Sequence, residues 1–144
     1  MNTKAIKSTL EDYAKAYCSK DIESMMSLFD DSDNISVIGT GANELCVGQK
    51  EVRDLFLRNF EEATATKFEW NWVDIRVSEN HAVISVTLTI HLEYKGQALK
   101  VPIRWTVVLK NKNEKWVWIH RNASTAASNQ DDGQAYPKDQ IENK

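Results

Sequence analysis

Apolar side chains in three segments recur at intervals of three and four residues, the spacing of an amphipathic helix. This pattern predicts helices over residues 3–18, 21–29 and 49–62, with Ser19-Lys20-Asp21 ending the first and capping the second. The apolar positions that carry the pattern are Ile6, Leu10, Tyr13, Ala14, Tyr17, Ile22, Met25, Met26, Phe29, Val52, Leu55, Phe56, Phe60 and Ala63. Each helix therefore has one side that must be buried against another layer.

The rest of the chain follows the period of two that is typical of strands. Two short strands are expected at residues 35–39 and 44–47, and four long antiparallel strands follow the third helix and end at about residue 126. The most regular segment, residues 82–93, alternates apolar and polar side chains without interruption. Lys95-Gly96 suits a two-residue hairpin turn, which pairs Leu92 with Leu99 and Val86 with Trp105.

The first long strand changes phase. Phe68, Trp70 and Trp72 alternate with polar residues, and the apolar positions then continue at Val73 and Ile75. One extra residue in a bulged, bent strand produces such a change. A long bent strand allows the sheet to wrap, so we predict an α+β domain: a cone-shaped, curved antiparallel sheet of about four long and two short strands, with three helices over its concave face and a cavity inside.

Composition narrows the function. The 144 residues carry a formal net charge of −3 and no basic run, so nucleic acid is not an expected partner. No secretory signal and no apolar stretch of bilayer length is visible, which predicts no membrane partner and a cytoplasmic location. Neither the two cysteines, Cys18 and Cys46, nor the histidines have the spacing of a metal site. We expect no metal or cofactor, one domain over residues 1–127, and a polar tail over residues 128–144.

Several short segments together resemble a known family. They are Tyr-Ala-Lys-Ala-Tyr-Cys-Ser-Lys-Asp at 13–21, Ser-Leu-Phe-Asp-Asp at 27–31, Gly39-Thr40 with Glu44, Arg104-x-Thr106, and Trp116-x-Trp118-Ile119-His120 leading to Ser124. To about residue 127 the chain resembles the SnoaL-like branch of the nuclear transport factor 2-like superfamily. That superfamily also contains ketosteroid isomerases, polyketide cyclases and the association domain of calcium/calmodulin-dependent kinase II.

The resemblance to the isomerases is incomplete at the residues that catalyse. Those enzymes use a Tyr on the first helix, a protonated Asp and a carboxylate base. The Tyr corresponds to Tyr13, but the base position falls in the segment from Ser36 to Gly39, and the acid position falls at or beside Trp105. SnoaL-like sequences also tend to have His where this chain has Asn122. The resemblance therefore implies the fold without a complete set of acid and base, and catalytic residues stay unassigned.

The register of the last hairpin decides which side chains face the helices, because a shift of one residue turns a strand over. We favour pairing Lys110 with Trp116, which brings Trp105 opposite Arg121 on the helix-covered face. The other face then carries a polar patch flanked by two tryptophans, for which we predict a homodimer interface. Its residues are Arg104, Thr106, Trp116, Trp118, His120 and Asn122.

A buried Arg121 needs an anionic partner, supplied by a ligand or by an internal acid such as Glu44. We favour a non-catalytic domain that binds a small, largely apolar molecule with an anionic or carbonyl end. The predicted ligand-binding residues are Tyr13, Tyr17, Glu44, Trp70, Trp72, Trp105 and Arg121. Two alternatives remain open: an isomerase, cyclase or dehydratase that uses Tyr13 as hydrogen-bond donor, and a protein association module. For the aromatic residues, plain core packing is the competing interpretation.

Overall fold

The computed structural model describes residues 3–139, which form three helices and one six-stranded sheet. The helices are α1 (Lys4–Cys18), α2 (Ile22–Ser27) and α3 (Gly48–Glu62). The strands are β1 (Ser36–Ile38), β2 (Leu45–Val47), β3 (Thr64–Ser78), β4 (His81–Tyr94), β5 (Gln97–Lys112) and β6 (Lys115–Ser124). Their order in the sheet is β2-β1-β6-β5-β4-β3. This arrangement confirms the predicted α+β fold.

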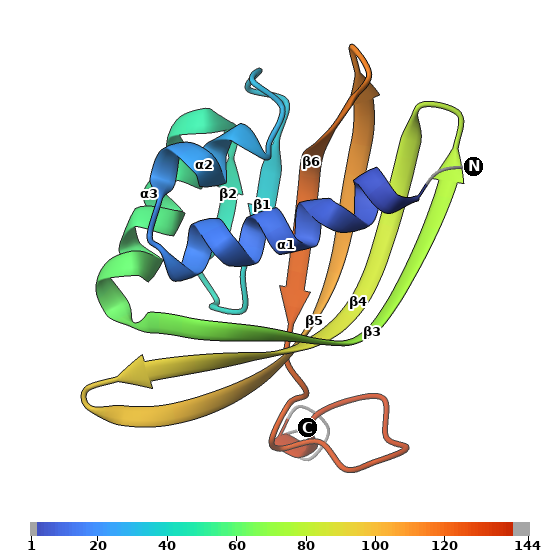
Figure 1. The fold of residues 1–144 in the computed structure, drawn as a ribbon. Helices are drawn as coiled ribbons and strands as arrows, with labels where there is room; N and C mark the ends of the chain where they lie inside the picture. Colours follow the sequence, from blue (N-terminus) through green and yellow to red (C-terminus); the bar gives the residue numbers. More distant parts are fainter. Residues whose placement is uncertain (1–2, 140–144) are drawn as a thin grey trace.

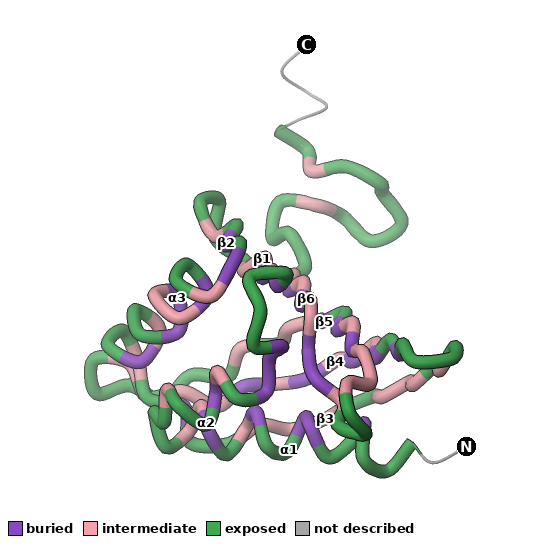
Figure 2. Tube along the Cα trace, turned by 90° about the horizontal axis from the view of Figure 1, so that it is seen from above, coloured by how far each residue is buried: buried purple, intermediate pink, exposed green. Residues whose placement is uncertain are grey.

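The three helices lie on one side of the curved sheet, with α1 crossing in front of the long strands (Figure 1). Buried residues occur on both the helices and the strands, as Figure 2 shows, and they form one hydrophobic core between the two layers. Asp21 caps α2 as expected, because its carboxylate accepts a hydrogen bond of 3.1 Å from the backbone N–H of Ser24. Sequence spacing therefore located both the helices and their buried faces.

The β4–β5 hairpin has the predicted register. Leu92 pairs with Leu99 and Val86 with Trp105, and the turn between the strands is Lys95-Gly96. Both turn residues have left-handed φ, +49° and +78°, as a two-residue hairpin turn requires. On the side away from the helices, which we call the outer face, Thr87 pairs with Arg104.

The bulge predicted in β3 is present, but its extra residue comes before Trp72 and not after it. The register shifts between Trp70, which pairs with Leu88, and Trp72, which pairs with Thr87 on the outer face. Trp72 is consequently 56% exposed. The prediction that Trp72 lines the cavity is therefore wrong, because the extra residue precedes it and turns its side chain outward.

The predicted register of the last hairpin is also wrong. Lys110 pairs with Val117, one residue beyond the expected Trp116, because the turn is the two-residue Asn113-Glu114, both with left-handed φ. A second shift of one residue follows at Ile119, between the pairs Leu109–Trp118 and Val108–His120. The two shifts add, so Arg121 lies opposite Val107. A displacement of two residues preserves the face, and Arg121 still points toward the helices.

The part of β6 that comes before the second shift differs from the predicted register by only one residue. The side chain of Trp118, which lies in this part, therefore points toward the helices and not to the outer face. It is 0% exposed, and its indole Nε1 donates a hydrogen bond of 2.9 Å to Thr9 Oγ1 on α1. Trp116 is half-buried and packs against the core as well. These two tryptophans therefore do not flank an exposed patch on the outer face, contrary to the prediction.

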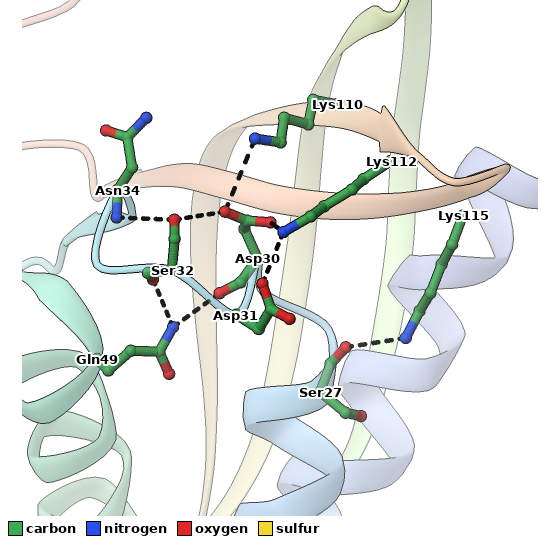
Figure 3. Close-up of polar contacts among 9 residues, drawn as sticks. All are labelled: Ser27, Asp30, Asp31, Ser32, Asn34, Gln49, Lys110, Lys112 and Lys115. Carbon is green, nitrogen blue, oxygen red and sulfur yellow. Dashed lines mark hydrogen bonds and ion pairs between the residues drawn. The ribbon is translucent and has the colours of Figure 1, made fainter.

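A buried carboxylate joins the loop after α2 to the last hairpin (Figure 3). Asp30, 1% exposed, accepts hydrogen bonds from Ser32 Oγ at 2.5 Å and Lys112 Nζ at 2.9 Å, and Lys110 Nζ lies 3.7 Å away. The Gln49 amide, at the start of α3, donates to the carbonyl oxygen of Asp30 at 2.7 Å. We call this group the Asp30 clasp. It fastens α2, α3 and the β5–β6 hairpin together at one end of the domain.

The described part of the predicted tail leaves the end of β6 and forms a loop outside the sheet (Figure 1). A backbone hydrogen bond of 2.8 Å from Lys138 N to Asn129 O closes this loop. Residues 140–144 of the predicted tail lie outside the described residues. Over residues 3–139, none of the helices has both the length and the apolar character that crossing a bilayer demands.

Candidate functional site

A pocket of about 300 Å³ lies between the inner face of the sheet and the helices α1 and α3. We call it the inner pocket. Five of the seven predicted ligand-binding residues line it: Tyr13, Tyr17, Glu44, Trp105 and Arg121. Its apolar wall comes mainly from Leu55, Ile90, Leu92, Val101 and Ile103. A hollow that combines an apolar wall with several convergent polar groups is a common form of a small-molecule site.

Arg121 is the most unusual side chain of the inner pocket, since it is charged and only 5% exposed. Its Nη1 donates a hydrogen bond of 2.8 Å to the hydroxyl oxygen of Tyr13, and its buried Nε has no partner. Within residues 3–139, no carboxylate lies within 4.0 Å of its guanidinium. The protein therefore buries a positive charge without neutralising it.

Aromatic rings supply part of the attraction that a carboxylate partner would give the guanidinium of Arg121. The guanidinium carbon of Arg121 lies 5.3 Å from the centre of a Trp105 ring and 6.0 Å from that of Phe56. Such cation–π contacts attract a guanidinium by up to about 2 kcal/mol when water is excluded. They offset only part of the cost of removing an ion from water, which is several kcal/mol. The charge of Arg121 is therefore only partly compensated, and an anion bound beside its guanidinium would be attracted to it.

Tyr13 and Tyr17 stack on each other at a centroid distance of 5.7 Å. Burial raises the pKa of both hydroxyls, and the nearby Arg121 guanidinium opposes part of the rise. Both phenols consequently stay protonated in neutral solution. The Tyr13 oxygen accepts from Arg121, so its own hydrogen remains available to donate to a second acceptor. Arg121 and Tyr13 together form a two-donor site for a carboxylate or carbonyl oxygen.

Glu44 does not neutralise Arg121, so the alternative of an internal ion pair between these two residues is wrong. Its Oε1 instead accepts a hydrogen bond of 2.8 Å from the backbone N–H of Gly41, within the turn between β1 and β2. A Cβ at Gly39 would lie 2.6 Å from the same oxygen. A glycine is needed at position 39 to let the turn hold this carboxylate at the pocket.

Three polar residues of the lining were not among the predicted site residues: Thr40, in the turn between β1 and β2, and Asn59 and Glu62 on α3. Asn59 and Glu62 belong to the last turn of α3, whose end lies at the inner pocket. Glu62 is exposed, whereas Arg121 and Tyr13 are buried. Only their place at the end of a helix that precedes a bent strand could have indicated them. In sequence they are indistinguishable from ordinary surface residues.

Trp70 and Trp72 do not line the inner pocket. Trp70 packs against Trp105, with ring centroids 5.9 Å apart, and its Nε1 donates a hydrogen bond of 2.6 Å to Glu11 on α1. Trp72 lies on the outer face. Trp70 therefore packs in the core as the competing interpretation holds, whereas Trp72 belongs neither to the pocket nor to the core.

The outer face carries the remaining predicted interface residues. Ser36 Oγ and His120 Nδ1 are 2.7 Å apart on neighbouring strands, Asn122 pairs with Thr106, and Arg104 donates to Ser124 Oγ at 3.1 Å. Leu45, Val47 and Trp72 are more than half exposed. The outer face thus combines satisfied polar groups with large exposed apolar side chains.

No cluster of three or more His, Cys, Asp or Glu side chains that could hold a metal ion occurs in the described part of the chain. Cys18 and Cys46 are both free thiols, and burial raises the pKa of each. Neither cysteine lines the inner pocket.

Comparison with known proteins gives a family and a fold. The profile of the SnoaL-like domain matches residues 6–128, whereas no curated protein matches the chain. One similar solved structure is a candidate dehydratase of the NTF2-like family from Streptomyces avermitilis. It is 16% identical, with a TM-score of 0.79, and the match covers 88% of this chain and 97% of that one.

Two further solved structures have the same fold with other descriptions. A candidate calcium/calmodulin-dependent protein kinase II association domain from Xanthomonas campestris is 17% identical, with a TM-score of 0.77 and coverage of 89% of this chain and 90% of the other. A ketosteroid isomerase-like protein from Erwinia carotovora atroseptica is 16% identical, with a TM-score of 0.71 and coverage of 85% and 95%. At these identities the likeness concerns the fold alone.

Proposed function

Because the chain belongs to the SnoaL-like domain family, a branch of the NTF2-like fold, we propose that its inner pocket binds a small, largely apolar molecule through an anionic end. The fold hosts enzymes and binding domains alike, so the proposal depends on the side chains of the pocket. The single observation that supports it most is the buried Arg121: within residues 3–139 it pairs with no carboxylate, and its one hydrogen bond is to Tyr13.

A carboxylate fits the unused bonding capacity of this site. One oxygen accepts from the guanidinium of Arg121 and the other from the hydroxyl hydrogen of Tyr13, in charge-assisted hydrogen bonds. The aliphatic wall and the ring of Trp105 then cover the apolar part of the ligand. A volume of about 300 Å³ lies at the lower end of the range for ligand sites, which limits the ligand to a small molecule.

We favour binding without catalysis. Proton abstraction needs a base aimed at the substrate, and of the acids that line the inner pocket Glu44 is held by Gly41 and Glu62 is exposed. An isomerase or lyase that uses Tyr13 as donor and Glu44 as base is the alternative. It predicts turnover of an unsaturated ketone that is lost in Glu44→Gln, whereas a binding domain gives no turnover.

Calorimetry with monocarboxylates from butanoate to octanoate, each beside its neutral amide, tests the proposal. We expect at least one acid to bind, and to bind more tightly than its amide. In Arg121→Leu this preference should disappear. Arg104→Leu is the matched control, since it removes the same charge from the outer face of the neighbouring strand. If no acid binds the parent protein, or if Arg121→Leu keeps the preference, the proposed function is wrong.

We also propose that the outer face pairs with a second copy of this chain. Trp72, Leu45 and Val47 together leave much apolar surface in contact with water, which is typical of an interaction site. Between them lie the polar residues Arg104, Thr106, His120 and Asn122 of the original prediction. An association module that recruits a different protein is the competing use of this surface.

A further inference from the structure

The acidic and the basic residues of the inner pocket differ in their exposure to water. Arg121 and Tyr13 are buried, whereas Glu62 is exposed and Glu44 half-buried. Apart from Arg121, no Lys or Arg of the described part of the chain lines the pocket. Neither glutamate has an ion-pair partner in the described residues. The water-accessible part of the lining therefore carries two negative charges without an ion-pair partner, and the buried part carries one positive charge.

The backbone of α3 adds to this negative potential. Asn59, Glu62 and Ala63 all line the inner pocket, so the carbonyl end of the helix lies there. A helix carries a partial negative charge of roughly half an electron at this end. Many helices place a basic residue in their last turn, but α3 has none there. The acids at positions 61 and 62 are at the end of the helix where a cation would be more stable.

We infer that the ligand of the inner pocket is zwitterionic: it has a carboxylate at one end and an ammonium group at the other, joined by an apolar spacer. This inference rests on the proposed function, because it assumes that the carboxylate binds Arg121. The ammonium then lies between Glu62 and Glu44, close to the carbonyl end of α3. A dicarboxylate of the same length would instead place its second negative charge beside two others.

The negative end also makes the pocket selective. Glu62 and Glu44 attract the ammonium group, but both are in contact with water, so each attraction is modest. Repulsion of a second carboxylate has a similar size and the opposite sign. Discrimination between an amine and an acid at this position includes both effects, and it therefore exceeds the discrimination between an amine and a neutral group.

A matched series of flexible six-carbon ligands tests the inference: hexanoate, ε-aminohexanoate and adipate. By calorimetry at low salt, we expect ε-aminohexanoate to bind about threefold to fivefold tighter than hexanoate, and adipate to bind weaker by a similar factor. In the double variant Glu44→Gln/Glu62→Gln the three dissociation constants should converge. Glutamine at position 44 keeps an oxygen for the Gly41 N–H, so the turn should be preserved.

Glu61→Gln is the matched control, because Glu61 is exposed on the same helical turn but does not line the pocket. It should leave the order of the three ligands unchanged. If hexanoate binds and requires Arg121 but the three ligands bind equally to the parent protein, the zwitterion inference is overturned and the proposed function stands. Preferred binding of adipate also overturns it. If none of the three binds at all, the proposed function itself fails for ligands of this length.

Discussion

Tyr13 on α1 and Arg121 on β6, 108 residues apart in the chain, share a buried hydrogen bond of 2.8 Å in which the guanidinium donates to the phenol oxygen. Tyr13 also packs against Trp118, Trp105 and Phe56. The tyrosine is thus part of the core and, at the same time, the only hydrogen-bond partner of the buried charge in the described part of the chain. Stability and binding are coupled through this pair.

Tyr13→Phe should lower the free energy of unfolding by about 1–3 kcal/mol, because it leaves a buried, charged donor without its acceptor. Urea denaturation followed by tryptophan fluorescence measures the change. Tyr17→Phe is the matched control: Tyr17 lies one helical turn away and stacks on Tyr13, but the hydrogen bond of Arg121 goes to Tyr13 and not to Tyr17. A loss in Tyr17→Phe equal to that in Tyr13→Phe would contradict the special role of the pair.

Arg121→Met should leave the protein as stable as the parent, or more stable, while it removes carboxylate binding. An isolated ion in the interior costs several kcal/mol, and replacing buried charge by an apolar side chain of similar volume is often neutral or stabilising. Thermal denaturation measures the stability. In the Arg121→Met background, Tyr13→Phe should cost much less than it does alone, because no orphaned donor remains. Additive losses in this double-mutant cycle would contradict the coupling.

Most of the fold was predictable from sequence because it depends on repeated patterns. The period of β4 and the Lys95-Gly96 turn determined the register of one hairpin completely, since fourteen paired positions must agree at once on which face is apolar. Single events were less predictable. The bulge before Trp72 turns the side chain of Trp72 to the outer face. The turn at Asn113-Glu114, which was not predicted, turns the side chain of Trp118 to the inner face.

The candidate site was partly predictable for the same reason. Two shifts of one residue move Arg121 by two residues along its partner strand, which leaves its side chain on the same face. The predicted face of Arg121 was therefore right, although its predicted partner was wrong. Glu62 could not be found, because a glutamate at the end of a helix has no periodic signature. Its importance comes from the position of α3 relative to the sheet, which only tertiary packing decides.

The Asp30 clasp should make the protein sensitive to acid. The hydroxyl of Ser32, together with Lys112 and Lys110, lowers the pKa of Asp30 from an ordinary value of 3.8 to about 2. A carboxyl group whose pKa is lower in the folded state stabilises the fold fully above its unfolded pKa, and loses this contribution as the pH falls toward the folded pKa. The contribution should therefore be complete above about pH 5 and decline from about pH 4 to pH 2.

Asp30→Asn tests this assignment. At neutral pH the variant should be less stable by about 1–3 kcal/mol, because Lys112 and Lys110 lose a buried anionic partner. The difference between the two proteins should shrink as the pH is lowered from 4 toward 2. Asp31→Asn is the matched control, since Asp31 contacts the same Lys112 but is exposed, and it should change little. A difference that stays constant with pH would show that Asp30 is not the responsible group.

Trp72→Glu tests the proposed pairing of outer faces. A glutamate at this position brings a negative charge into any contact between two copies of the sheet, and burying it without a partner opposes association. Light scattering after size exclusion should show a dimer for the parent chain and a monomer for the variant, with the same circular dichroism. Leu57→Glu is the control, because Leu57 is an exposed apolar residue on α3 and not on the sheet. That variant should stay dimeric. A parent chain that is monomeric at all concentrations, or a Trp72→Glu variant that still forms dimers, would contradict the use of this face.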